Sequence, residues 1–256
     1  MTTATMASDK LEIGRVIQQT FEVLGRNFVT FLALAAILTG IPTVIVGLIQ
    51  MEASETNSAT AWAWFVTTGL ISGVAALVLQ GALTYGAIHY LNDRRVSIAE
   101  SITIGLRSFL ALFAVGLLYG LAVALGSLLL LVPGIMIAIA WCVAVPVLIA
   151  ERKPIMDTFG RSAELTRGNR WRIFGLVLIY VVAYVIIGAI IAALSGAWLL
   201  VNGDGDVGAG PGEIAVNTVT NVISSLIGAT GGAVLYTELR RVREGATPNA
   251  LAAIFD

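Results

Sequence analysis

Charged residues are scarce in this sequence. Only 12% of its 256 residues are charged, 57% are hydrophobic, and the mean hydropathy is +0.90. Soluble domains carry about 25% charged residues on average. The composition therefore predicts a polytopic integral membrane protein.

Residues that carry out chemistry are also scarce. The chain has one histidine, His89, and one cysteine, Cys142. An intramolecular disulfide, a cysteine metal cluster and a His-His metal pair are therefore excluded within one chain. The apolar runs lack Asp and Glu at membrane depth. This excludes a catalytic pair of carboxylates within the membrane and the usual proton relays of pumps. We expect no catalytic residue, no metal, no cofactor and no enzymatic activity.

Six apolar runs are each long enough to cross a membrane, which needs about 20 residues as a helix. The Pro133-Gly134 pair predicts a tight turn between the third and fourth runs. Together these two runs form a stretch of about 43 uncharged residues, which is too long for one span. Pro42 and Pro146 predict bends within the first and fourth runs. The runs cover residues 27–50, 61–91, 108–132, 134–150, 170–201 and 213–236.

Positive charge is confined to one side of these runs. All 15 Lys and Arg residues fall in the N-terminal segment, in the connections after the second and fourth runs, or in the C-terminal segment. In the loops on the other side, every charged residue is acidic. The positive-inside rule then places both termini in the cytoplasm, which requires an even number of spans. The first 27 residues lack the pattern of a cleaved signal peptide.

Short amphipathic segments precede the first, third and fifth runs. Each segment has a glycine near its end, followed by Asn or Ser and an aromatic residue, as at residues 25–28, 105–109 and 168–171. We therefore predict an all-α integral membrane protein with six transmembrane helices in three hairpins. A short amphipathic interfacial helix on the cytoplasmic side precedes each hairpin. The predicted organisation is a single domain, 1–256, with an N-terminal amphipathic segment (1–26), an interfacial segment (151–169) and a short tail (246–256).

Basic residues beside the runs predict contacts with lipid headgroups. Arg170 and Arg172 flank Trp171 where the fifth run begins. At such a position arginine extends its charged end to the membrane–water interface, and tryptophan anchors the helix there. Anionic headgroups attract each basic side chain near the surface by about 1 kcal/mol. Acidic residues at helical spacing neutralise part of this group of basic residues. The sequence also lacks the exposed aromatic residues that would stack on nucleic-acid bases, so nucleic-acid binding is not expected. The predicted headgroup residues are Arg26, Arg107, Arg161, Arg167, Arg170, Trp171 and Arg172.

Small and polar residues inside the runs predict how the helices associate. Glycine and other small residues at four-residue spacing let helix backbones approach closely in lipid. Side-chain amides in the runs predict hydrogen bonds between helices, about 0.6 to 2 kcal/mol each, with a headgroup or solute lining as the alternative. The predicted packing residues are Gly116, Gly120, Gly188, Gly228 and Gly232, and the amides are Gln80, Asn217 and Asn221.

Four stretches carry a family resemblance. They are residues 131–135, 146–151, 161–175 and 235–245, and the most specific core is Leu-Thr-Arg-Gly-Asn-Arg-Trp at 165–171. The chain resembles, over nearly its whole length, the bacterial membrane-domain family named after the membrane portion of glycerophosphoryl diester phosphodiesterase. The resemblance implies a multi-span protein of the bacterial inner membrane, of mostly unknown function. The phosphodiesterase reaction belongs to a separate soluble domain, whose metal-binding acids and histidines this sequence lacks.

Three functions follow from these features. The first is a non-enzymatic membrane protein that engages lipid or an amphiphilic solute, with anionic membrane lipids among its partners and no nucleic acid. The alternative is a structural or assembly subunit of a membrane complex, with a membrane protein partner or a second copy of itself. The third is a small-solute transporter, which the absence of charge in the spans disfavours. A central cavity near Gln80 or Asn221 would favour transport.

Overall fold

The computed structural model describes residues 10–53, 58–91, 97–202 and 211–245. Regular structure in these ranges is entirely helical, and six candidate membrane spans are long and apolar enough to cross a bilayer. The predicted all-α class with six candidate spans is therefore confirmed. The elements are α1 (Ile13–Arg26), α2 (Phe28–Ala35), η1 (Ala36–Gly40), α3 (Ile41–Ala53), α4 (Ser58–Leu91), α5 (Ile98–Leu129), α6 (Leu131–Ala140), α7 (Ala144–Glu151), α8 (Ile155–Thr166), α9 (Arg170–Asn202) and α10 (Pro211–Glu244).

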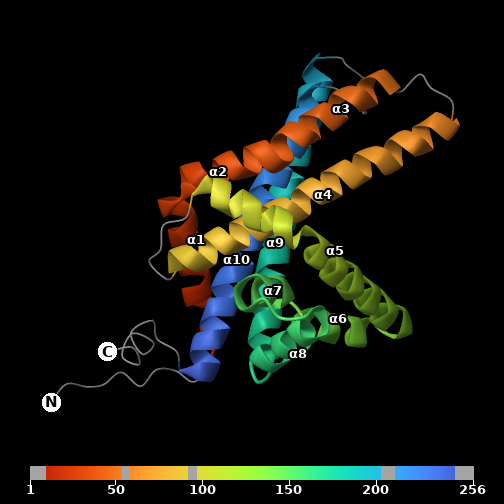
Figure 1. Cartoon of the computed structure of the whole chain (residues 1–256). Helices are drawn as coiled ribbons and strands as arrows, with labels where there is room; N and C mark the ends of the chain where they lie inside the picture. Colours follow the sequence, from red (N-terminus) through yellow and green to blue (C-terminus); the bar gives the residue numbers. More distant parts are fainter. Residues whose placement is uncertain (1–9, 54–57, 92–96, 203–210, 246–256) are drawn as a thin grey trace.

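Helices α4 and α10 form the centre of the molecule (Figure 1). Helix α4 packs against α3, α5, α7 and α10, and α10 also contacts α1, α8 and α9. Their facing side chains are fully buried, as Leu79 and Leu83 on α4 and Ala233 and Leu239 on α10 illustrate. In lipid such contacts are held by close packing rather than by a hydrophobic driving force between helices.

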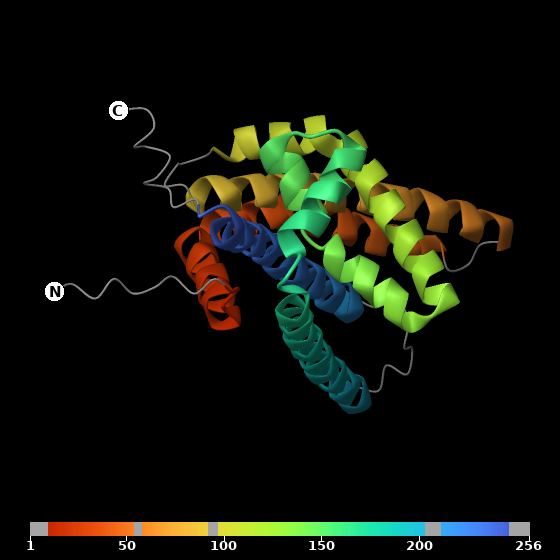
Figure 2. The same ribbon diagram turned by 90° about the horizontal axis from the view of Figure 1, so that it is seen from below.

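Helix α9 stands apart from the other spans. Figure 2 shows it extending away from the bundle. Only 6% of its apolar window is buried, against 17% to 50% in the other five spans. Its exposed side chains between Val177 and Ile190 are almost all aliphatic or tyrosine. The helix therefore offers nearly its whole circumference to its surroundings.

Proline accounts for two irregular spans. The first span contains the π-helical stretch η1, which ends two residues before Pro42, and the fourth is broken at residues 141–143, which end three residues before Pro146. A proline lacks the N–H that the carbonyl four residues earlier would receive, so regular helix geometry is interrupted there. The bends predicted at these two prolines correspond to the observed irregularities.

The chain reverses between α5 and α6 at Leu130, whose backbone is extended (φ −161°, ψ 143°). The turn predicted at residues 132–134 is therefore placed too late. Pro133 lies in the first turn of α6, where its missing N–H has no helical partner to lose. Gly134 lies so close to Ser127 that a Cβ atom would overlap the serine. This glycine allows the two helices to meet directly at the turn.

The predicted entry helices agree with the structure in part. Helices α1 and α8 are separate short helices before the first and fifth spans, and Gly168 has a positive φ of 88° after α8. The separate helix predicted before the third span is wrong, because α5 runs unbroken from Ile98 to Leu129. Ser97 caps α5 by accepting a hydrogen bond from the Glu100 N–H at 3.1 Å. The predicted tail, 246–256, lies outside the described residues.

Candidate functional site

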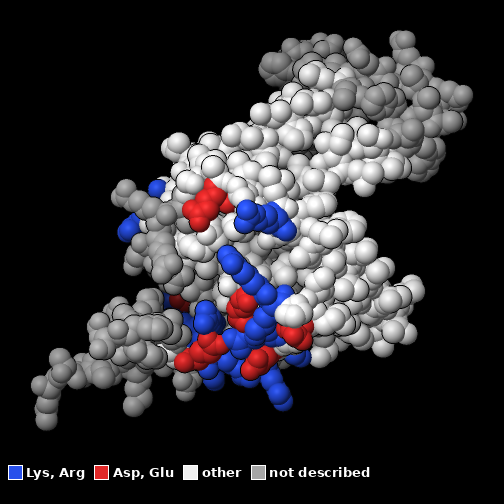
Figure 3. All heavy atoms as spheres, in the orientation of Figure 1, with Lys and Arg blue, Asp and Glu red and all other residues white. Residues whose placement is uncertain are grey.

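Charged side chains gather around α8 and the C-terminal end of α10 (Figure 3). The described surface over α3 and over the far ends of α5 and α6 is uncharged in this view. Residues that are far apart in sequence, from α7, α8 and α10, meet at the charged end. This end holds the first candidate site.

An ion-pair network centred on Arg161 joins these three helices. Arg161 Nε donates to both oxygens of Glu151, at 3.1 and 3.2 Å, and its other nitrogens contact Glu164 and Glu244. Tyr236 donates its hydroxyl to Glu151 Oε1 at 3.1 Å. Burial alone would lower the pKa of the Arg161 guanidinium, but the hydrogen bonds to Glu244, Glu151 and Glu164 raise it above its usual range. Arg161, predicted to contact headgroups, is thus engaged by protein carboxylates.

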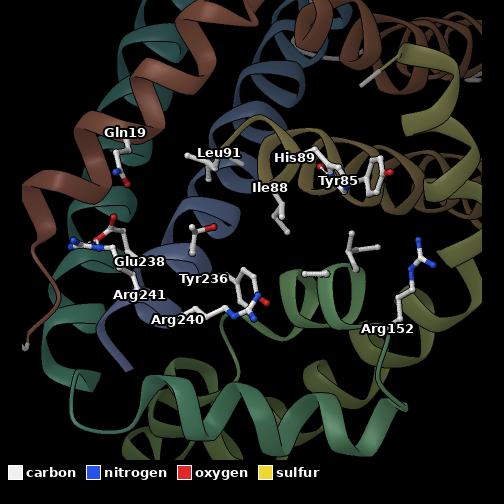
Figure 4. A pocket seen from close by; sticks show the side chains of 13 residues that line it. Gln19, Tyr85, Ile88, His89, Leu91, Arg152, Tyr236, Glu238, Arg240 and Arg241 are labelled. Carbon is white, nitrogen blue, oxygen red and sulfur yellow. Dashed lines mark hydrogen bonds and ion pairs between the residues drawn. The ribbon is translucent and has the colours of Figure 1, made fainter. Parts of the chain in front are cut away.

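A cavity of about 440 Å³ adjoins this network, and we call it the arginine cavity (Figure 4). It lies at the charged end, where α1, α4, α7 and α10 meet. Figure 4 shows Arg152 on one side, Arg240 and Tyr236 near the middle, and the Arg241–Glu238 pair on the other side. The lining residues are Gln19, Tyr85, Ile88, His89, Leu91, Ile149, Ala150, Arg152, Tyr236, Thr237, Glu238, Arg240 and Arg241.

The arginine cavity has an excess of positive charge. Its lining contains three guanidinium groups and one carboxylate, that of Glu238, which is 3% exposed. Arg241 binds Glu238 Oε2 through Nε and Nη2, at 3.1 and 2.9 Å, and Arg240 binds Glu244 at 2.7 Å. Arg152 makes no ion pair with any described residue. It is thus the guanidinium that is free to bind an anion.

The backbone of Arg152 is itself unusual. Arg152 ends α7 with a left-handed backbone, φ 50° and ψ 35°, a conformation that costs a non-glycine residue about 1 kcal/mol. Its N–H closes α7 by donating to the Leu148 carbonyl at 3.1 Å. This sharp ending positions the Arg152 side chain at the edge of the arginine cavity.

His89 and the apolar residues complete the lining. The His89 Nδ1 lies 3.0 Å from the Tyr85 carbonyl, which can only accept, so this hydrogen bond requires the hydrogen on Nδ1. Ile88, Leu91 and Ile149 provide apolar surface beside these polar groups. The cavity therefore combines cationic groups with an apolar wall at the ends of three spans.

The other residues predicted to contact headgroups are spread over the surface. Arg172 Nη1 donates to the Leu11 carbonyl at 2.6 Å, which ties the start of α1 to α9. Arg26 pairs with Glu22 at 2.8 Å, and Arg167 accepts a bond from Arg243 through its carbonyl at 3.3 Å. Trp171 is 85% exposed. These residues are not brought together into one site.

Arg170 and Arg107 complete that set. The Nε atom of Arg170 is buried without a hydrogen-bond partner in the described part of the chain. Arg107 is exposed on α5, and no described residue forms an ion pair with it. Neither arginine lines the arginine cavity.

Several of the predicted packing and amide residues border a second cavity. Gln80, Gly116, Gly228 and Gly232 all border this space of about 310 Å³, which we call the mid-span cavity. Gly120 is exposed, and a Cβ at Gly120 or Gly188 would meet no atom within 4 Å. Asn217 and Asn221 are exposed on α10, and neither lines the cavity that Gln80 borders.

The closest helix approaches use other glycines. A Cβ on Gly105 of α5 would overlap the Val78 carbonyl of α4, and a Cβ on Gly81 would lie 3.2 Å from the Gly105 Cα. These two glycines form the crossing point of α4 and α5. The four-residue spacing of small residues did not single them out.

The described residues contain no group of three or more His, Cys, Asp or Glu side chains placed to hold a metal ion. No protein family, curated protein or solved structure matches the chain. The two cavities must therefore be interpreted from their own chemistry.

Sequence reasoning did not select Arg152, Arg240 and Arg241 as site residues. The only signal for them was their position at the ends of the fourth and sixth spans. That position does not reveal which span ends meet. The turn into α8 and the packing of α10 against α4 and α7 bring them together.

Proposed function

We propose that this chain is a non-enzymatic integral membrane protein that binds an amphiphile with an anionic headgroup in the arginine cavity. The observation that carries the proposal is the excess of guanidinium groups beside an apolar wall at the ends of three spans. Arginine suits phosphate and carboxylate groups because its planar fork donates two parallel hydrogen bonds. The apolar side chains beside it suit the first part of an acyl chain.

The membrane orientation is part of this proposal. The one-sided distribution of Lys and Arg supports both termini in the cytoplasm, and the arginine cavity then faces the cytoplasmic leaflet. Anionic lipids concentrate on that leaflet and attract basic groups. The proposed bacterial inner membrane rests on the resemblance of the four sequence stretches alone, since no protein family matches the chain. We further propose that the six spans form three hairpins and that α1 and α8 lie near the membrane interface.

Replacing Arg152 with alanine is expected to lower the retention of anionic lipid by roughly ten-fold or more, because it removes the guanidinium that no described carboxylate neutralises. The measurement is native mass spectrometry of the protein from nanodiscs that contain phosphatidylglycerol and phosphatidylcholine. One charge-assisted hydrogen bond contributes about 1.5 to 3 kcal/mol, so a loss of roughly ten-fold or more is expected.

Arg107→Ala is the matched control, since Arg107 is an exposed arginine outside the arginine cavity. Retention of phosphatidylglycerol by this variant should equal that of the parent chain. An equal loss in both variants would show that the surface attracts anionic lipid diffusely. No loss in either variant would contradict the proposal.

The assembly-subunit alternative has its own supporting observation. Asn217 and Asn221 lie one helical turn apart on α10, both are exposed, and neither has a hydrogen-bond partner in the described part of the chain. Amide groups in hydrocarbon normally bond to another helix. The exposed surface of the neighbouring α9 could pack against the same partner.

If a second copy of the chain provides that partner, the double replacement of Asn217 and Asn221 by leucine should convert an oligomer into a monomer. The mass of the complex in nanodiscs measures this change. Thr218→Val is the control, because the Thr218 hydroxyl already donates to the Ile214 carbonyl at 2.7 Å. A parent chain that is monomeric in nanodiscs would refute self-association through this face.

A further inference from the structure

The mid-span cavity lies halfway along four spans. Its lining comes from Gln80 and Thr84 on α4, from Gly116 and Tyr119 on α5, from the break between α6 and α7, and from α10. A volume of about 310 Å³ is at the lower end of the range for small-ligand sites. Its central position separates it from the arginine cavity at the charged end.

The broken fourth span supplies backbone polar groups to this cavity. Residues 141–143 are out of helix, and Pro146 has no N–H to offer the Cys142 carbonyl. On the α8 side of the break, the Ala140 carbonyl accepts from Ser162 Oγ at 3.0 Å and from Thr166 Oγ1 at 3.2 Å. The break is therefore satisfied on one side by α8 and borders the mid-span cavity on the other.

Two side-chain polar groups in the cavity, those of Thr84 and Gln80, lack hydrogen-bond partners within the described part of the chain, whereas the Tyr119 hydroxyl donates to the Ala138 carbonyl at 3.4 Å. Thr84 is 1% exposed and lines the cavity, yet its hydroxyl makes no hydrogen bond to any residue that the structure describes. Comparable helix threonines, such as Thr20 and Thr39, donate to the carbonyl four residues earlier. The amide of the half-buried Gln80 side chain also makes no hydrogen bond to another described residue, and a polar group that faces an apolar environment without a partner costs free energy.

We infer that the mid-span cavity binds an uncharged, hydroxyl-bearing group. Its lining contains no charged side chain, so an ion would find no counter-charge there. The Thr84 hydroxyl and Gln80 amide can both donate and accept, which matches a hydroxyl that does the same. This inference concerns a second site and does not depend on the arginine cavity.

We place the entrance of this cavity between two glycines that border it. Gly116 on α5 and Gly228 on α10 both border it, and both are exposed. A Cβ at Gly116 would meet no atom within 4 Å, and one at Gly228 would meet only the Tyr180 hydroxyl, at 3.6 Å. The absence of side chains at these positions leaves a lateral entrance, so a membrane amphiphile can enter as well as a free solute.

The test compares monoolein with methyl oleate, which has the same acyl chain but no hydroxyl. The full chain is placed in phosphatidylcholine nanodiscs with either probe, and native mass spectrometry measures the probe that remains bound. Monoolein should be retained roughly ten-fold more than methyl oleate, as expected for one or two hydrogen bonds formed by otherwise unpartnered groups. Competition by free glycerol would identify a soluble ligand, and no competition would identify a membrane one. Both results support a hydroxyl site.

Two variants locate the binding. Thr84→Val combined with Gln80→Leu should remove the preference for monoolein, whereas Thr103→Val should keep it, because the Thr103 hydroxyl is exposed and bonds to the Ala99 carbonyl. Gly116→Leu should block binding by filling the entrance, and it is expected to fold because the space there is open. Arg152→Ala should leave the preference unchanged, which separates this site from the arginine cavity.

Equal retention of the two probes by the parent chain would overturn the inference. A preference for monoolein that persists in Gly116→Leu would also overturn it, since the cavity would then not be the binding place. The Gly116→Leu result decides the question even if the variant with both polar groups removed does not fold.

Discussion

Replacing Arg161 with alanine is expected to destabilise the protein by about 3 kcal/mol, the cost of leaving partly buried carboxylates without their counter-charge. Arg161 is only 14% exposed, and Glu151 beside it is 13% exposed. Among the described residues, its guanidinium is the one group that contacts carboxylates from α7, α8 and α10 together. Thermal unfolding in detergent, followed by circular dichroism, measures the loss.

The conservative variant sharpens this prediction. Arg161→Lys keeps the charge but cannot bind both oxygens of Glu151 while also reaching Glu164 and Glu244, so it should recover only part of the lost stability. Arg107→Ala removes an exposed arginine and should change stability by less than about 0.5 kcal/mol. If Arg161→Ala were as stable as Arg107→Ala, the network would have no role in holding the three helices together.

Replacing Gly105 with alanine is expected to cost about 2 kcal/mol, because a single added carbon overlaps the backbone of the neighbouring span. Besides the overlap with the Val78 carbonyl, a Cβ at Gly105 would lie 3.3 Å from the Ala82 nitrogen. These are backbone atoms of α4, so they cannot move aside without moving the helix. Thermal unfolding of the parent chain and the variant in the same detergent, compared by melting temperature, measures the cost.

Gly116→Ala provides a control on the same helix. No atom lies within 4 Å of a Cβ at Gly116, and alanine is a better helix former than glycine. This variant should be at least as stable as the parent chain. Equal destabilisation at both positions would indicate a general requirement for glycine in α5 rather than a close crossing with α4.

The span count was readable from the sequence because apolar length and one-sided positive charge are properties of each segment alone. The irregularities at Pro42 and Pro146 were also predictable, since a missing N–H acts within its own helix. By contrast, the meeting of Arg161 with Glu151 and Glu244 depends on how three helices pack, and no local pattern encodes it. The sequence pairs Arg161 with Asp157 and Glu164 by helical spacing, but only the second pair is among the ion pairs that the structure contains.

The glycines illustrate the same limit. A four-residue spacing of small residues identifies a smooth helix face but not what covers it. Gly116 and Gly228 border a cavity, whereas Gly81 and Gly105 carry the helix crossing. The prediction of small residues as packing sites could therefore not separate contact from empty space.

The contact between the broken fourth span and α8 also has a consequence for biogenesis. The Ala140 carbonyl receives its side-chain hydrogen bonds from residues 22 and 26 positions later in the chain. While the ribosome is still adding that stretch, the fourth span has no intramolecular donor for this carbonyl from α8. The span's final conformation is therefore completed only after α8 has been synthesised and has folded back against it. The synthesis of residues 141–166 thus sets a minimum time for which the break stays uncovered.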